Sequence, residues 1–133
     1  GIAQLKKLDY IIKKQRENYY KIWDKIKKLP GVYKRKYPRN SKISADALII
    51  KVKNQVVAKK CRKNLLKNNI FTKILPEAFT WHFAGEWSHM KELKNKSLKK
   101  SQEKLKSMVS IPIFIKMKKN TPNLIYQSLK KSL

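Results

Sequence analysis

The residues best suited to chemistry lie between 76 and 90, a stretch that contains no Lys or Arg in a chain otherwise rich in Lys. This stretch holds both His and two of the three Trp, and its centre reads Trp81-His82-Phe83-Ala84-Gly85-Glu86-Trp87. Aromatic faces bind apolar or sugar C–H surfaces, and an imidazole exchanges a proton near neutral pH. Trp81, His82 and Trp87 are therefore predicted to line a small-molecule pocket. The alternative is that the two Trp side chains only cover the end of a sheet.

Other kinds of site receive less support. His82, Glu86 and His89 have the spacing H-x3-E-x2-H, which does not place both imidazoles on one helical face, so no metal site is expected. A glycine-rich phosphate loop is excluded because the chain has only three glycines, which are far apart (Gly1, Gly31 and Gly85). No lysine lies in an apolar pocket that the sequence can identify, so none can be nominated as a Schiff-base nucleophile.

Cys61 is the single cysteine. It cannot form an internal disulfide, which fits a reducing compartment and favours a cytoplasmic protein. Val57, Cys61 and Leu65 follow one another at i+4, so the thiol is predicted to lie in the core, with a reactive thiol as the less favoured alternative. The longest apolar run, 108–115, is too short to cross a membrane, and the amino-terminal residues carry no targeting signal.

The charge of the chain is extreme. Lys and Arg total 34 against 8 Asp and Glu, a net charge of +26, and only four of the basic residues are Arg (Arg16, Arg35, Arg39 and Arg62). Sequence-specific recognition of nucleic acid relies on the planar fork of Arg, so this bias argues against it. Two interpretations stay open. Lys, Asn and Ile share AT-rich codons, so genome composition can supply the excess; alternatively, the chain is a basic module that holds nucleic acid nonspecifically.

The elements that must position the aromatic stretch begin with a long helix over 1–30. Apolar residues recur there at threes and fours from Leu5 to Leu29, and Pro30-Gly31 stops the pattern. A helix of this length usually connects two domains. Its amino half is therefore expected to expose apolar surface that the other domain or a second subunit covers. Residues 31–44 carry turn formers and no clean period, which predicts a basic loop of the kind that is often functional.

The remainder, 45–133, is predicted to be a small α/β domain with an open sheet flanked by helices. Strands are expected at 45–53, 70–75 and 109–115, the last with Pro112 at an edge, an end or a bulge. Helices are expected at 55–67 with Asn54 as the cap, from Lys91 to about Met108, and from Thr121-Pro122 onward, with Thr121 as the cap and four apolar side chains facing inward (Leu124, Ile125, Leu129 and Leu133).

These residues resemble a known family. The segments Gly1 to Asp9, Arg16-Glu17-Asn18 and Tyr19-Tyr20 resemble the helix that follows the active-site half of the DegT/DnrJ/EryC1/StrS sugar aminotransferases. The strand at 45–52, the helix ending at Asn69, Leu75-Pro76 and Ser110-Ile111-Pro112 are similar to the small carboxy-terminal domain of that family. The Trp-His-Phe-Ala-Gly stretch is most similar to the branch that aminates the eighth carbon of a deoxy-octulosonic acid.

The resemblance implies a fold-type I enzyme that uses pyridoxal 5'-phosphate (PLP) and works as a homodimer. It implies that the PLP-binding lysine and most other cofactor-binding residues lie in a large domain upstream of Gly1, and a first residue other than Met agrees with that. His82 matches a family histidine that approaches cofactor and substrate. The complete protein is expected to transfer an amino group from glutamate to a keto-sugar in cell-surface polysaccharide biosynthesis, whereas this chain alone is expected to be inactive.

Two other functions remain open beside this one. The first is the basic nucleic-acid-binding module without catalysis. The second is a stand-alone scaffold or interaction protein, which would leave the aromatic stretch without a role. The family does not require a charge of +26, and this is the feature of the chain that departs from the resemblance.

Overall fold

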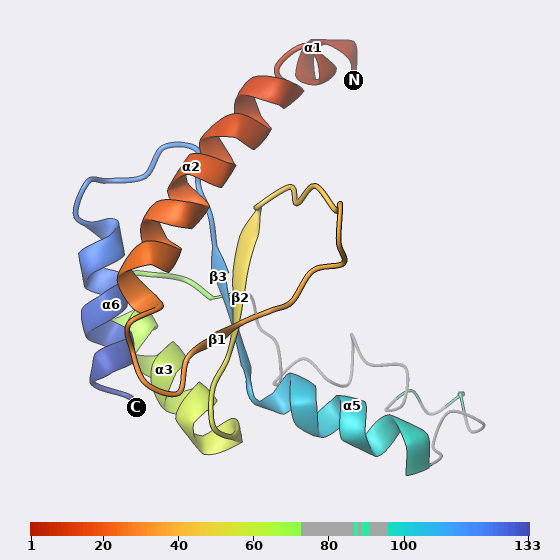
Figure 1. The fold of residues 1–133 in the computed structure, drawn as a ribbon, viewed down its shortest axis with the longest axis vertical. Coiled ribbons are helices and arrows are strands. Elements are labelled where there is room, and N and C mark those ends of the chain that lie inside the picture. The colour runs from red at the N-terminus through yellow and green to blue at the C-terminus, as the bar shows by residue number, and fades with distance from the viewer. Residues whose placement is uncertain (73–86, 88, 91–95) are drawn as a thin grey trace.

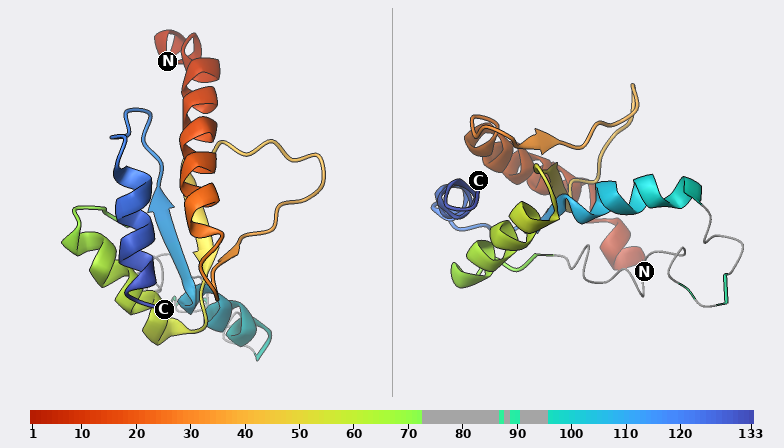
Figure 2. Two further views of the ribbon diagram at one scale, coloured as in Figure 1. Left: turned by 60° about the vertical axis from the view of Figure 1, so that its left-hand side comes forward. Right: turned by 90° about the horizontal axis from the view of Figure 1, so that it is seen from below.

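A computed structural model describes residues 1–72, 87, 89, 90 and 96–133. Its elements are α1 (Ile2–Leu5), α2 (Leu8–Ile26), β1 (Tyr33–Lys34), β2 (Ala47–Lys51), α3 (Gln55–Lys67), α5 (Lys96–Lys106), β3 (Met108–Pro112) and α6 (Thr121–Lys130). Helices α2, α3 and α6 form a layer against the sheet, while α5 extends away from that layer (Figures 1 and 2). No helix in these ranges is long and apolar enough to cross a membrane.

The sheet has three antiparallel strands in the order β1-β2-β3, with β2 in the centre. Leu48 pairs with Ile111 and Ile50 pairs with Val109, and all four side chains are fully buried. Because alternate residues of a strand point to the same face, these two pairs make one continuous apolar face toward the helices. The prediction of an open sheet with flanking helices is confirmed.

Helix α2 packs on this face through its carboxy-terminal half. Tyr19, Ile22 and Ile26 are buried there against α6 and β2. Asn18 also contributes, because its amide Nδ2 donates to the carbonyl oxygens of Phe114 at 2.7 Å and Ile115 at 3.1 Å. These bonds attach α2 to the segment after β3, and they satisfy a polar group that would otherwise be costly to bury.

The prediction of one long helix over 1–30 is wrong at both ends. The chain turns at Lys6 and Lys7, which separates α1 from α2, and α2 ends at Ile26. Ile2 is 75% exposed, and a helical segment without tertiary packing gains little stability from its own hydrogen bonds. The predicted end of the helix before Pro30-Gly31 is confirmed, because a turn follows α2 and Gly31 has a φ of 76°.

The middle of the chain was predicted with mixed success. Helix α3 has the predicted bounds and the predicted cap: the Asn54 side chain accepts a hydrogen bond from the Val57 amide at 3.0 Å. The loop predicted over 31–44 contains strand β1, which the prediction missed because β1 depends on pairing with β2. A strand was predicted over 70–75, but residues 70–72 do not form one. The Ile70 amide instead donates to the Leu65 carbonyl and so ends helix α3. Its remaining residues lie outside the described ranges.

The last elements are close to the prediction. Pro112 is the final residue of β3, one of the three places expected for it. Of the helix predicted from Lys91, the part from Lys96 onward is described, and it ends at Lys106. The cap predicted at Thr121 is wrong: Asn120 precedes α6, and its side chain accepts from the Asn123 side chain at 3.2 Å but caps no backbone amide of the helix. Ile125 and Leu129 are buried as predicted, but Leu124 is exposed because α6 turns only one face to the core, and Leu133 is exposed beyond the end of α6.

Candidate functional site

The predicted aromatic site is described only at one of its three residues. Trp81 and His82 lie outside the described ranges. The Trp87 ring is half-buried and stacks on the imidazole of His89, with 5.6 Å between ring centres and 23° between planes. The backbone closes a turn beneath this pair, because the Met90 amide donates to the Trp87 carbonyl at 3.0 Å. Neither of the two pockets described below is lined by Trp87.

The metal ligands considered in the sequence cannot be assembled from the described residues. His82 and Glu86 fall outside them, and His89 is exposed. Within the described part of the chain, no three His, Cys, Asp or Glu side chains come together as metal ligands.

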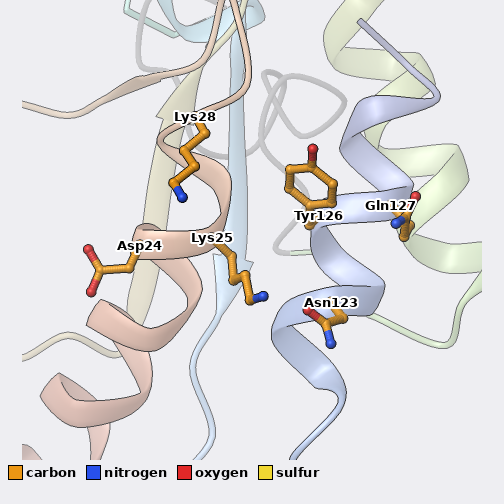
Figure 3. Close-up of a pocket in the computed structure, with 6 residues that line it drawn as sticks. All are labelled: Asp24, Lys25, Lys28, Asn123, Tyr126 and Gln127. Atoms are coloured by element: carbon orange, nitrogen blue, oxygen red, sulfur yellow. The ribbon is translucent and has the colours of Figure 1, made fainter.

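One pocket lies between α2 and α6 and has a volume of about 280 Å³ (Figure 3). Lys25 and Lys28 line it from α2 and the turn after it, and Asn123 and Tyr126 line it from α6. Asp24 lies at its edge and points away from α6 in Figure 3, and its carboxylate accepts a hydrogen bond from Lys27 Nζ at 2.6 Å. The pocket offers ammonium, amide and hydroxyl groups, and its one carboxylate, that of Asp24, is bonded to Lys27, which does not line the pocket.

A second pocket, of about 380 Å³, lies between α2 and residues 34–43. We call it the α2–loop pocket. Its cationic side chains are Arg16, Lys34 and Lys42, and its aromatic side chains are Tyr20 and Tyr37. None of the described residues that line it is acidic. These groups can bind an anion and stack on a flat ring.

Helix α2 holds the loop side of this pocket in place. Arg16 Nε donates to the Ile43 carbonyl at 2.8 Å, and the Tyr19 and Tyr37 hydroxyl oxygens are 3.5 Å apart. Burial raises the pKa of the Tyr19 hydroxyl, and the contact with Tyr37 raises it further, so this group stays protonated over the physiological range. Tyr19 therefore serves to position Tyr37 and is no proton donor in catalysis at neutral pH.

Cations also lie over the aromatic rings of this region. Lys34 Nζ is 5.3 Å from the ring centre of Trp23 and 6.0 Å from that of Tyr20. The Arg35 guanidinium lies 5.8 Å from the ring centre of Tyr37. Contacts of this length are attractive because the ring face is electron-rich. They orient both the cations and the rings.

Cys61 lies in the core, as predicted. Its side chain is fully buried, and burial raises the pKa of the thiol, although a hydrogen bond with Ser132 opposes part of that shift. Thiolates are the reactive form of cysteine, so this residue is suited to packing and not to nucleophilic chemistry.

The described residues do not form an anchor for PLP. Such an anchor needs a lysine whose amine loses its proton easily, which requires a dry or cationic pocket. Every lysine whose burial the structure describes is partly or fully exposed. None of these lysines has the surroundings that such an anchor needs, and the position of the PLP-binding lysine stays a prediction.

A small antiparallel sheet covered by a long leading helix and two further helices is the architecture of a piece of a PLP aminotransferase fold. The profile of the DegT/DnrJ/EryC1/StrS aminotransferase family matches residues 1–130, so the chain belongs to this family.

Solved structures with this fold come from several bacteria. Helicobacter pylori PseC, an aminotransferase of pseudaminic acid biosynthesis, has a TM-score of 0.76 at 17% identity, over 98% of this chain and 35% of PseC. The aminotransferase TlmJ of Streptoalloteichus hindustanus has a TM-score of 0.75 at 11% identity, over 98% and 34%. The E. coli GDP-4-keto-6-deoxy-D-mannose-3-dehydratase has a TM-score of 0.68 at 20% identity, over 97% and 33%. This chain thus spans about a third of each of these proteins.

The α2–loop pocket was missed in the sequence, although one signal for it is present. Residues 33–37 read Tyr-Lys-Arg-Lys-Tyr, which interleaves aromatic and basic side chains. That pattern suits an anion-binding surface, but nothing local shows that the segment returns to α2. The contact that makes the pocket joins Arg16 to Ile43, 27 residues away.

Proposed function

We propose that this chain is the carboxy-terminal part of a PLP-dependent sugar aminotransferase that moves an amino group from glutamate to a keto-sugar. The observation that carries the proposal is the family match over residues 1–130, in a chain that spans about a third of the matched structures. A large PLP-binding domain then precedes residue 1, residues 1–30 connect the two domains, and the complete protein is a cytoplasmic homodimer. The product enters cell-surface polysaccharide, such as lipopolysaccharide.

The sugar is proposed to be a nucleotide-linked keto-sugar or an 8-oxo octulosonic acid. The second choice is supported by the resemblance of the Trp81 to Trp87 stretch to the octulosonate branch of the family. In this proposal the rings of Trp81 and Trp87 pack on the sugar, and His82 orients its carbonyl or exchanges a proton with it. Bound PLP supplies the amino-group chemistry, and this chain supplies one wall of the cleft.

The isolated chain is expected neither to bind PLP covalently nor to transaminate. A Schiff base needs a deprotonated lysine amine, which a dry or cationic pocket supplies, and every lysine whose burial the structure describes is partly or fully exposed. Borohydride reduction in the presence of PLP, followed by peptide mass spectrometry, should give only scattered, substoichiometric pyridoxyl-lysine. Stoichiometric labelling of one lysine within 1–133 would contradict the assignment of the cofactor anchor to the preceding domain.

The function itself is tested in the protein extended by its preceding domain. His82→Asn should lower turnover by about 10²–10⁴-fold if the imidazole serves as acid or base, and by less if it only orients the sugar. His89→Asn is the comparison at the other histidine: its ring stacks on Trp87, so this change should act on the apparent KM for the sugar and not on turnover. Trp81→Ala and Trp87→Ala should mainly raise the apparent KM for the sugar.

Thermal melts accompany these kinetics, because loss of a packed Trp can destabilise a domain by about 3–5 kcal/mol. If His82→Asn keeps full turnover while both Trp variants lose stability but not affinity, the aromatic stretch is a structural cover. If no keto-sugar is aminated by the extended wild-type protein, the proposed function itself is wrong.

A further inference from the structure

We propose that the segment between β1 and β2 docks the protein on the anionic headgroups of a lipid bilayer. The docking segment is residues 34–42, which we call the basic arc. The proposal concerns contact with a membrane surface and does not rest on the proposed reaction. The cationic side chains of the basic arc are Lys34, Arg35, Lys36, Arg39 and Lys42.

The charge of the basic arc is dense and has no acidic counterpart nearby in the chain. Five of its nine residues are Lys or Arg, and no acidic residue lies between Asp24 and Asp46. All of its cationic residues except Lys34, which is half-buried, are exposed. Clusters of roughly four to eight Lys or Arg are typical of segments that bind anionic lipids. The basic arc therefore has the charge that such a surface needs.

The arginines of the chain are concentrated at the basic arc. Arg35 and Arg39 belong to it, and Arg16 donates from α2 to the Ile43 carbonyl directly after it, at 2.8 Å. Arg62, the fourth arginine, is buried on α3. Codons rich in A and T favour Lys over Arg, so codon composition does not explain this concentration. The planar fork of Arg binds two oxygens of a phosphate group at once, which a Lys ammonium cannot do.

The shape of the basic arc suits a flat partner. Figures 1 and 2 show the chain between β1 and β2 extending outward from the sheet, away from α3 and α6. Its tip is a turn in which the amide and the hydroxyl of Ser41 both donate to the Pro38 carbonyl, at 3.3 and 2.8 Å. Arg39 lies within this turn and is exposed. A protruding cationic turn can contact a plane, whereas a small ligand or a peptide needs a concave site.

The basic arc is already ordered. The Arg35 amide donates to the Ile49 carbonyl at 3.1 Å at one end, and Arg16 holds Ile43 at the other end. Docking therefore requires little further ordering of this segment. No large apolar side chain is exposed between residues 34 and 42. The contact with a bilayer is therefore electrostatic, without insertion into the hydrocarbon, and salt should reverse it.

The aromatic rings beside the basic arc favour a bilayer over a single-stranded nucleic acid. Single strands bind by stacking their bases on the faces of aromatic side chains. The Arg35 guanidinium lies 5.8 Å from the ring centre of Tyr37, and Lys34 Nζ lies 6.0 Å from that of Tyr20. A base would have to compete with these cations for the ring faces, whereas lipid headgroups need only the cations.

The test is flotation of the 133-residue chain with vesicles, which separates bound chain from self-associated chain. Vesicles of phosphatidylcholine with phosphatidylglycerol are compared with vesicles of phosphatidylcholine alone, at about 0.15 M salt, where charges beyond ~8 Å are largely screened. Binding is expected only to the anionic vesicles, and it should weaken as salt is added. Equal binding to both kinds of vesicle would overturn the proposal, because the exposed apolar surface of α1 would then account for it.

Two triple variants remove the same charge from different surfaces. The arc variant is Lys36→Gln, Arg39→Gln and Lys42→Gln, and the matched α3 variant is Lys59→Gln, Lys60→Gln and Lys63→Gln. All six side chains are exposed, so neither variant should impair folding, which the thermal midpoint checks. Each Lys or Arg at a bilayer surface contributes a factor of about five in affinity, so the arc variant should bind about 100-fold more weakly. The α3 variant should lose less than about three-fold, because α3 lies away from the arc in Figures 1 and 2 and its charges are screened.

The remaining outcomes also decide the proposal. Equal weakening by the two triple variants would overturn it, because the net charge of the chain would then be the cause. Tighter binding of a single-stranded oligouridylate than of the anionic vesicles, lost in the arc variant alone, would make the arc a nucleic-acid surface instead. The same flotation with the protein extended by its preceding domain should retain the binding, and loss of binding there would show that the arc is covered and would overturn the proposal.

Discussion

Cys61 illustrates how burial decides what one side chain can do. In the folded state the pKa of the Cys61 thiol is raised, because a thiolate would lose its hydration in the core. In the unfolded chain the thiol titrates near its ordinary value of 9.0. Between these two pKa values the unfolded chain binds fewer protons than the folded chain. The contribution of Cys61 to the free energy of unfolding is therefore fully present below pH 9, and it falls as the pH rises through this window.

We expect this linkage to show as a pH-dependent difference between the wild type and Cys61→Ala. At pH 7 the wild type should be the more stable protein, because Sγ fills space in the core. Above pH 9 its advantage should shrink by up to about 1.4 kcal/mol per pH unit. Urea unfolding at pH 7 to 10.5 measures this difference, and every titratable group other than Cys61 is common to the two proteins. A difference that stays constant to pH 10.5 would contradict the raised thiol pKa.

The turn after α2 is an element whose geometry depends on one residue. Gly31 has a φ of 76°, in the region that residues with a Cβ avoid, and Val32 immediately after it enters the core. A Cβ added at Gly31 would meet no atom within 4 Å. Any cost of a side chain there is therefore backbone strain and not a clash.

Gly31→Ala should accordingly lower the free energy of unfolding by about 1 kcal/mol, the usual cost of placing Ala in the left-handed region. Gly31→Asn should lower it less, since Asn tolerates this conformation better. Gly1→Ala serves as the control, because a Cβ at Gly1 also meets nothing within 4 Å. Equal stability of Gly31→Ala and the wild type in urea would show that the turn relaxes at no cost.

The elements also show which parts of the fold could be predicted from sequence. The bounds of α3 were correct because its start is signalled locally, by Asn54 and the Val57 amide three residues on. Strand β1 was missed because two residues gain their structure only by pairing with Lys51 and Ile50. The α2–loop pocket was missed for the same reason, since it depends on a contact across 27 residues. The aromatic stretch at Trp81 and His82 stays a prediction.

At the scale of the whole molecule, membership of the family does not account for the high positive charge. The family match covers residues 1–130, yet nothing in the described fold requires a net charge of +26. Described ion pairs are short-range, joining Lys14 to Glu17 and Lys27 to Asp24 on α2, and both are exposed. Exposed pairs add little to stability, so these two do not explain the lysine excess, and codon composition and nonspecific binding of nucleic acid both stay open as interpretations.

The amino-terminal end of the molecule exposes apolar surface, as the sequence predicted. Ile2, Leu5 and Leu8 are 75%, 68% and 45% exposed, and Tyr10 is exposed beside them. Figure 1 shows α1 and the start of α2 extending beyond the sheet and the other helices. In the proposed aminotransferase, the preceding domain or the second subunit would cover this end. The 133-residue chain by itself leaves it in water.

The isolated chain should therefore self-associate or bind a hydrophobic dye, because exposed apolar surface of this kind drives association. Leu5→Gln with Leu8→Gln should reduce dye fluorescence and self-association while leaving the thermal midpoint unchanged, since neither side chain packs in the core. The control is Val56→Gln on α3, which is 62% exposed on a different element and should have a smaller effect. Sedimentation velocity and dye titration measure both quantities. A monodisperse wild-type monomer whose amides are protected from exchange between Leu5 and Ile12 would contradict this expectation, because the amino-terminal end would then be stable without any cover.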